Sequence, residues 1–268
     1  MTTVLLHGLG ADRRQPLGLF ESVVEDVSDP DELIVAPDVR AHGGFLAVGE
    51  PADFELDRLA AEVCTQVPVV IAEAGRGVLA TSEPVTIIGI SMGAAIALRI
   101  ALAGRLPVAR AVFVRPSFDD RSLPEHLRPF PVIGQVLVDA GPAGVAEFAE
   151  RALYRRIAAE SPAGGRALLA QFQAPDAARR AMRLVEIPRN RAFETDAQLG
   201  ELAARGIRSL VVGALRDPVH PVPVAERWAG GLGAPMELVP GRDDGPAAQT
   251  AALRERVGRW LRGNEPCR

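Results

Sequence analysis

Lysine is absent from this sequence of 268 residues, and all 30 of its basic residues are arginine. The absence excludes a lysine nucleophile, a Schiff base and the lysine of a phosphate-binding loop. Only two cysteines occur, Cys64 and Cys267, and their wide separation indicates neither a metal site nor a redox pair. We therefore expect a reducing, cytoplasmic setting and no metal.

An excess of positive charge is also lacking, since the net charge is −4 and the pI is about 5.7. Without an unbalanced basic cluster, a nucleic-acid partner is not expected. The sequence runs from Met1 straight into apolar Val4 without the basic start of a signal peptide, and no apolar run approaches the roughly 18 residues of a membrane span. These features predict a chain that acts on a small molecule, without a membrane partner, and they leave the oligomeric state open.

Short apolar runs rich in β-branched residues alternate with segments of helical periodicity. We predict strands over residues 2–6, 33–36, 85–89, 109–114, 209–213 and 236–239. Helices are predicted over 18–27, 53–80, 92–103 and a closing stretch to about 261, with Pro68 expected to kink or break the second. The alternation predicts an α/β fold with a doubly wound, mainly parallel sheet.

The central motif runs from Gly89 through Ser91 to Gly93, between a predicted strand and a predicted helix. This G-x-S-x-G pattern is typical of a nucleophile elbow, a sharp turn that lifts a serine hydroxyl clear of the sheet. Glycines are needed there because side chains would collide with the crossing strand or helix. The helix N-terminus offers N–H groups to a developing oxyanion. The alternative is an ordinary turn in which Ser91 caps the helix.

Two further motifs follow earlier strands: His-Gly-x-Gly at residues 7–10 and Asp-x-Arg-x-His-Gly at residues 38–43. Together with the elbow, in this order, they make the chain resemble the single-domain type of the α/β-hydrolase superfamily. The family's second motif is usually Asp-x-Arg-Gly-His-Gly, and Ala41 replaces its first glycine. The resemblance implies that the backbone N–H groups of Leu9 and Met92 form an oxyanion hole. It also implies that Asp38, Arg40 and His42 mainly fix a loop beside the site.

The segment 116–206 has helical periodicity and no convincing strand, with helices predicted over 143–159, 165–173 and 176–185. The resemblance implies that this segment is a helical cap inserted in a core of residues 1–115 and 207–268. Six of the twelve aromatic residues lie there. They either pack the cap onto the core or line an apolar pocket: Phe118, Phe130, Phe148, Tyr154, Phe172 and Phe193.

A serine nucleophile needs a base, and the base needs an orienting acid. The family order is Ser, acid, His. Asp217 stands where the acid is expected, although an Asp before Pro also begins turns. The family's histidine belongs to the loop after the last strand, here residues 241–246, and this loop has none.

Several residues are candidates for the missing base. His220 follows Asp217 closely, but it is equally compatible with a turn before a helix beginning at Pro221. Asp119 could orient His220 in place of Asp217. His126 of the cap is a further candidate, less favoured because cap histidines are mostly surface residues. Asp243 and Asp244 have the character of a solvated turn.

We predict a cofactor-independent serine hydrolase of a small, mostly apolar ester, lactone or related acyl substrate. Ser91 is the predicted nucleophile, Asp217 the acid and His220 the base, while Leu9 and Met92 are the oxyanion donors. Two alternatives stay open. In the first, the chain is a degenerate hydrolase that binds a ligand without turnover. In the second, it is a lyase or isomerase that uses the same pocket.

Overall fold

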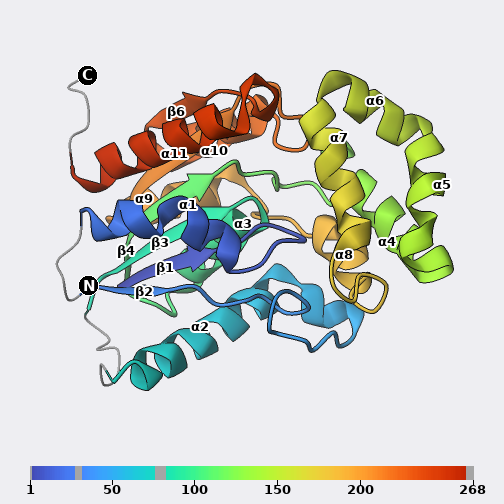
Figure 1. The fold of residues 1–268 in the computed structure, drawn as a ribbon. Helices are drawn as coiled ribbons and strands as arrows, with labels where there is room; N and C mark the ends of the chain where they lie inside the picture. The colour runs from blue at the N-terminus through green and yellow to red at the C-terminus, as the bar shows by residue number, and fades with distance from the viewer. Residues whose placement is uncertain (1, 28–31, 76–82, 264–268) are drawn as a thin grey trace.

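The structure is a computed structural model that describes residues 2–27, 32–75 and 83–263. Within them, six strands form one sheet in the order β2-β1-β3-β4-β5-β6, with every neighbouring pair parallel (Figure 1). The strands are β1 (Thr2–Leu6), β2 (Leu33–Val35), β3 (Val85–Ile90), β4 (Val108–Val114), β5 (Arg208–Ala214) and β6 (Met236–Val239). The predicted parallel α/β sheet is confirmed. Each strand lies within one residue of its predicted bounds.

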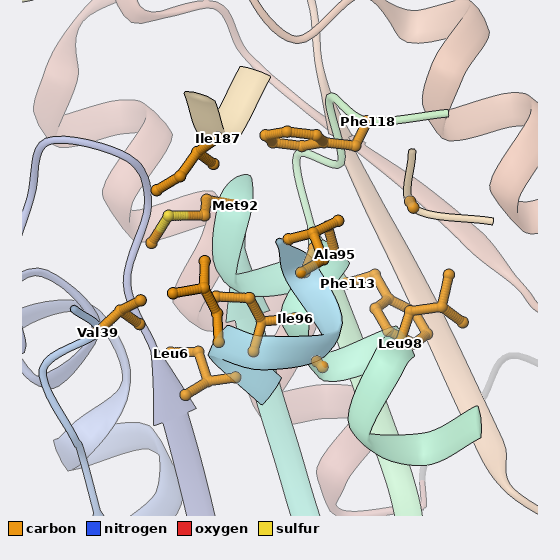
Figure 2. Close-up of a cluster of buried hydrophobic side chains, with 14 of the residues drawn as sticks. Leu6, Val39, Met92, Ala95, Ile96, Leu98, Phe113, Phe118 and Ile187 are labelled. Carbon is orange, nitrogen blue, oxygen red and sulfur yellow. The ribbon is translucent and has the colours of Figure 1, made fainter. Parts of the chain in front are cut away.

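Helices cover both faces of the sheet, which explains why its central strands are apolar throughout. On one face α1 (Arg14–Glu25) and α11 (Pro246–Leu261) contribute to one buried cluster. On the other face α2 (Leu56–Glu73), α3 (Met92–Ala103) and α10 (Val222–Leu232) contribute to a second, larger one. In Figure 2 the side chain of Met92, at the start of α3, lies within this second cluster close to Ile187.

The remaining helices follow β4 and lie mostly beside one end of the sheet (Figure 1). They are α4 (Pro129–Ala140), α5 (Val145–Glu150), α6 (Ala152–Glu160), α7 (Pro162–Leu169) and α8 (Met182–Glu186). Short 3₁₀ turns occur at η1 (Pro51–Phe54), η2 (Glu125–Leu127), η3 (Gly141–Gly144), η4 (Ala170–Gln173), η5 (Ile187–Arg189) and η6 (Arg242–Asp244). A last helix, α9 (Asp196–Ala204), packs against α10 and α3 on the core side. We call residues 116–206 the cap for brevity; that this segment forms a separate cap, and its boundaries, stay predictions.

Helix bounds differ from the sequence prediction where single residues leave the helical conformation. Arg151 is extended, with ψ of 139°, so the helix predicted over 143–159 is divided into α5 and α6. Glu55 is likewise extended, so α2 begins at Leu56 rather than residue 53. Helix α2 continues through Pro68, because proline removes one hydrogen bond while the buried face of the helix stays packed. Residues 76–80 of that predicted helix, and Cys267, lie outside the described residues.

Other cap helices also differ from prediction. Only the C-terminal part of the helix predicted over 176–185 is α-helical, and α4 was not predicted. The stretch from Glu125 to Glu150, which includes α4, is long and apolar enough for a membrane span by length and composition alone. A single helix of this kind is weak evidence, since buried helices of other proteins meet the same test; here 33% of the apolar window is buried, and α4 packs against α8. The expectation of a chain without a membrane partner stays a prediction.

Candidate active site

Ser91 occupies a strained turn between β3 and α3. Its φ of 54° and ψ of −109° place it in a region that residues other than glycine rarely adopt. A Cβ atom at Gly89 would lie 2.2 Å from the Gly93 carbonyl oxygen, and one at Gly93 would lie 2.5 Å from the Leu6 carbonyl oxygen. Both glycines are therefore required by close approach of the backbone, as the nucleophile-elbow motif predicts.

A cavity of about 150 Å³ lies beside this turn. Loops that follow the strands line it from the core, through Leu9, Ser91, Asp217 and His220. Helices α4 and α7 and the turn η4 line it from the cap. Of the six aromatic residues of the segment 116–206 named above, only Phe130 lines the cavity, so the others serve mainly to pack the cap.

His220 and Asp217 form a hydrogen-bonded pair on the loop after β5. The Nδ1–H group of His220 donates to Asp217 Oδ2 at 2.9 Å. The other carboxylate oxygen, Oδ1, accepts the backbone N–H groups of Val219 and His220, both at 3.1 Å. Asp217 therefore both shapes the turn and orients the imidazole. Pro221 is the N-cap of α10, which begins at Val222, so the loop ends one residue later than predicted.

The second ring nitrogen of His220, Nε2, has no hydrogen-bond partner among the described residues, and the ring lines the cavity. Burial lowers the pKa of His220 below its usual 6.5, and the charges of Arg115 and Arg242 add to this effect, against the opposing effect of Asp217. Burial alone would raise the pKa of Asp217, but His220 and Arg115 outweigh it and the net pKa is lowered. At neutral pH the pair is thus a carboxylate and a neutral imidazole, the state that a general base requires.

Ser91 is not hydrogen-bonded to His220. Its Oγ lies 3.1 Å from the Oγ of Ser117, a fully buried residue that follows β4. The backbone oxygen of Ser117 in turn accepts a hydrogen bond from His126 Nε2 at 2.6 Å. His126 is therefore engaged with Ser117. No motif in the sequence indicates that Ser117 contacts Ser91 and His126, because a serine in a loop after a strand is common.

The other acidic candidates are engaged elsewhere. Asp119 accepts hydrogen bonds from the backbone and side chain of Arg121, so it does not orient His220. In the loop after β6, Asp243 accepts hydrogen bonds from Ser161 Oγ at 2.5 Å and from the Ala163 N–H group at 2.8 Å. Asp243 and Asp244 are both exposed, as expected for a solvated turn, and Asp243 in addition joins this loop to the cap.

The loop after β1, which carries Leu9, is held by buried polar residues. His42 Nε2 accepts the Gly10 N–H group at 3.1 Å, while its Nδ1–H group donates to the Arg40 carbonyl oxygen at 2.8 Å. Both ring nitrogens are thus occupied, and burial with the nearby Arg183 and His7 holds the pKa of His42 well below 6.5. These contacts agree with the structural role that was expected for His42.

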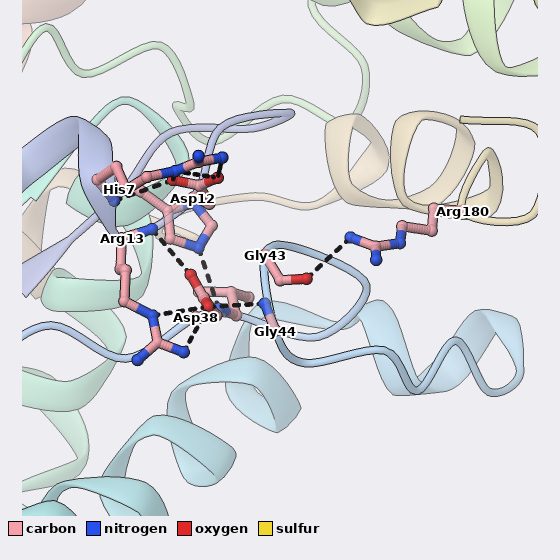
Figure 3. Close-up of polar contacts among 9 residues, drawn as sticks. His7, Asp12, Arg13, Asp38, Gly43, Gly44 and Arg180 are labelled. Carbon is pink, nitrogen blue, oxygen red and sulfur yellow. Dashed lines mark hydrogen bonds and ion pairs between the residues drawn. The ribbon is translucent and has the colours of Figure 1, made fainter. Parts of the chain in front are cut away.

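Asp38 supports the neighbouring loop (Figure 3). Its carboxylate accepts hydrogen bonds from the N–H group of Arg13 at 2.8 Å, from Arg13 Nε at 2.9 Å and from the Gly44 N–H group at 2.8 Å. From the cap, Arg180 donates to the Gly43 carbonyl oxygen at 3.1 Å. Arg40 forms an ion pair with Glu62. Asp38 and Arg40 therefore have the supporting contacts that the resemblance implied.

Comparison with known proteins agrees with this architecture. A family model described as the alpha/beta hydrolase family matches residues 3–260, and the chain belongs to this family. No curated protein matches it. Among the described residues, no group of three or more His, Cys, Asp or Glu side chains is arranged to hold a metal ion.

Solved structures share the fold at low identity. A thermophilic esterase from Thermogutta terrifontis, with malate bound, has a TM-score of 0.65 and 18% identity over 99% of this chain and 91% of that one. The alpha/beta hydrolase MGS-M2, from a Medee basin deep-sea metagenome library, has a TM-score of 0.65 and 16% identity over 100% and 90%. MenH from S. aureus has a TM-score of 0.61 and 16% identity over 98% and 92%.

Proposed function

We propose that this protein is a serine hydrolase that cleaves a small ester, lactone or related acyl substrate. The observation that carries the proposal is the His220–Asp217 pair, which lines the same cavity as the elbow residue Ser91. A neutral imidazole, oriented by a carboxylate and with one nitrogen free, has the state and environment of a general base. His220 would thus replace the histidine that the loop after β6 lacks.

In the proposed reaction, Ser91 Oγ attacks the substrate carbonyl carbon while its proton passes to His220 Nε2. The tetrahedral intermediate collapses, the bond to the leaving oxygen breaks, and the leaving group takes that proton. A water molecule then attacks the acyl group on Ser91, giving its proton to His220, which returns it to Ser91 Oγ as the acid is released. Asp217 stays ionised throughout and holds the imidazole.

The backbone N–H groups of Leu9 and Met92 are the proposed donors to the oxyanion. Met92 is the first residue of α3, so its N–H group has no partner within the helix. Leu9 lies in the loop that His42 supports through Gly10, and it lines the cavity. Strands β1 and β3 are neighbours in the sheet, which brings the two loops together.

The contact between Ser91 and Ser117 belongs to the resting site in this proposal. Attack requires Ser91 Oγ to leave Ser117 and turn toward His220, a rotation about one side-chain bond. The same contact favours a second candidate function, ligand binding without turnover, because a serine that stays on Ser117 has no base.

A fluorophosphonate probe distinguishes the two functions, since it reacts with activated serines. We expect labelling of the wild type, none of Ser91→Ala, and a strong decrease in His220→Gln. Asp244→Asn is the matched control, because Asp244 contacts Arg216 and Gly241 rather than His220. A folded wild-type protein that resists labelling would favour binding without turnover.

A further inference from the structure

The cavity beside Ser91 is rich in arginine, although a mostly apolar substrate was predicted from the sequence. Arg115, Arg216 and Arg242 all line it, from the loops after β4, β5 and β6. Asp217 is the one carboxylate among the described residues that line this cavity. With three guanidinium groups against one carboxylate, the lining of this side of the cavity has an excess of positive charge.

Arg115 is buried without being fully satisfied. Its side chain is 4% exposed, and its Nε atom has no hydrogen-bond partner among the described residues. Its Nη1 atom makes only long contacts, at 3.4 Å to Gln249 Oε1 and 3.9 Å to Asp217 Oδ2. Burial, followed by the charge of Arg242, lowers the pKa of Arg115 to about 10, so the guanidinium is still charged at neutral pH. A buried cation that makes only long contacts with its neighbours favours an anionic ligand nearby.

Arg242 has no acceptor for its side chain among the described residues. The acidic residues that follow it in the loop are committed to other partners. Asp243 binds Ser161 and Ala163 of the cap, and Asp244 pairs with Arg216 and caps the loop at Gly241. Neither acidic side chain lines the cavity, whereas Arg242 does. Arg242 is therefore the guanidinium most available to a ligand.

The opposite side of the cavity has a different character. There, beside Gly10, the side-chain oxygen of Gln171 is buried without a partner, and Leu9 contributes an apolar surface. Because the strand order places β3 between β1 and β4, Ser91 stands between this side and the arginine side. A substrate with its carbonyl at Ser91 can thus reach the arginines with one end.

We propose that the substrate carries a carboxylate group, held mainly by Arg242 together with Arg115, a few bonds from the carbonyl that Ser91 attacks. Guanidinium groups bind carboxylates through paired, charge-assisted hydrogen bonds. The cavity volume is close to that of an engineered cavity that holds benzene, about 150 Å³, so the chain between carboxylate and carbonyl is short. This inference rests on the proposed function for the position of the carbonyl, but the anion site can be tested without turnover.

The first test compares hydrolysis of monoethyl succinate with that of ethyl succinamate, in which a neutral amide replaces the carboxylate. Released ethanol is measured with a coupled oxidase. We expect kcat/KM to favour the anionic ester by roughly tenfold or more, a typical effect of one charged hydrogen-bonded contact. Arg242→Gln should remove most of this preference by raising KM for the anionic ester alone, and Arg242→Lys should restore part of it.

Arg155→Gln is the matched control, because Arg155 is an exposed cap residue that pairs with Glu150 and does not line the cavity. It should leave the preference unchanged. Equal kcat/KM values for the two esters in the wild type, or a preference that survives Arg242→Gln, would overturn the proposal.

The second test measures binding alone, by calorimetry on Ser91→Ala with succinate and with neutral succinamide. We expect succinate to bind more tightly and to lose roughly tenfold in affinity on Arg242→Gln in the same background. If neither ester is hydrolysed but succinate still binds through Arg242, the proposed hydrolase function fails and the anion site stands. If succinate and succinamide bind alike, the anion site fails whatever the hydrolysis result.

Discussion

In the proposed site, the loops after β5 and β6 have roles that differ from those that the family usually gives them. In the loop after β5, Asp217 and His220 are three residues apart and already hydrogen-bonded to each other. In the loop after β6, where the family places its histidine, Asp243 fastens the cap and Arg242 faces the cavity. The comparison shows that the groups that reach the cavity define the site. Loops that follow neighbouring strands lie at the same edge of the sheet, so either loop can place a side chain beside the cavity.

The largest expected effect is a difference in kcat/KM between variants of the two loops. His220→Gln should lower kcat/KM for a small ester by roughly 10⁴-fold or more, because an amide cannot accept the serine proton. Asp244→Asn in the other loop should change it by less than about threefold, since only the pair with Arg216 is weakened. Steady-state kinetics on the two purified variants measures both values. Comparable losses would mean that the loop after β6 takes part in the chemistry after all.

The pH dependence of kcat/KM sharpens the assignment of His220. A base must be neutral, and burial and two arginines lower the pKa of His220 below 6.5. Activity should therefore persist as the pH falls to 6.5 and decline only below it, as the imidazole becomes protonated. In Arg242→Gln, removal of one positive charge should raise this pKa and move the decline to higher pH.

A pH profile of each variant, with one neutral ester as substrate, provides the measurement. A decline centred above 6.5 in the wild type would contradict a buried, arginine-flanked base. A profile of Arg242→Gln that coincides with that of the wild type would show that Arg242 does not act on His220.

The loop after β6 should affect the cap more than the chemistry. Asp243→Ala removes the acceptor for Ser161 Oγ and for the Ala163 N–H group. We expect faster hydrogen exchange at the start of α7, because this end of the cap opens more often. Mass spectrometry of peptides covering residues 161–169 detects the change. Asp244→Asn is the control and should leave exchange there unaltered. An equal effect of both variants would show that Asp243 does not hold the start of α7 in place.

The smallest expected effect concerns the loop after β2, which also departs from the family pattern. Ala41 has φ of 60°, a conformation that costs an L residue roughly 1–2 kcal/mol. Ala41→Gly relieves this strain but loses a buried methyl group and adds backbone entropy, so the free energy of unfolding should change by less than about 1 kcal/mol. Ala95→Gly, in the interior of α3, relieves no strain and should lower the free energy of unfolding by roughly 1.5 kcal/mol.

Urea unfolding of the two variants measures this contrast. A larger loss for Ala41→Gly than for Ala95→Gly would mean that the alanine methyl group matters more than the strain at this position.

The predictions from sequence succeeded where local patterns determine the structure. Each strand was found because parallel strands covered on both faces are apolar runs. The elbow around Ser91 was found because the backbone cannot turn that tightly with side chains at residues 89 and 93. The cap helices were less well predicted. Their ends depend on single residues, such as Arg151, that leave the helical conformation.

The polar residues around the site were predicted only in part. Asp217 and His220 were named as candidates, but the sequence left His220 open as a turn residue. Ser117 and Arg115 were not singled out as site residues, since their significance depends on the buried contacts that they make. Arg242 was considered only as part of the loop at residues 241–246, which lacks the histidine that the family has there.

By itself the sequence determined the sheet, the strained serine and the glycines that permit it, because these follow from steric rules that act within a few residues. Only the tertiary structure decided which histidine faces the cavity and which is enclosed, and which acidic groups are already paired. The physical reason is that hydrogen bonds and charge effects on a pKa depend on distances of a few ångströms between residues far apart in the chain. The proposed exchange of roles between the loops after β5 and β6 depends on such distances, because the two strands are parallel neighbours and end side by side.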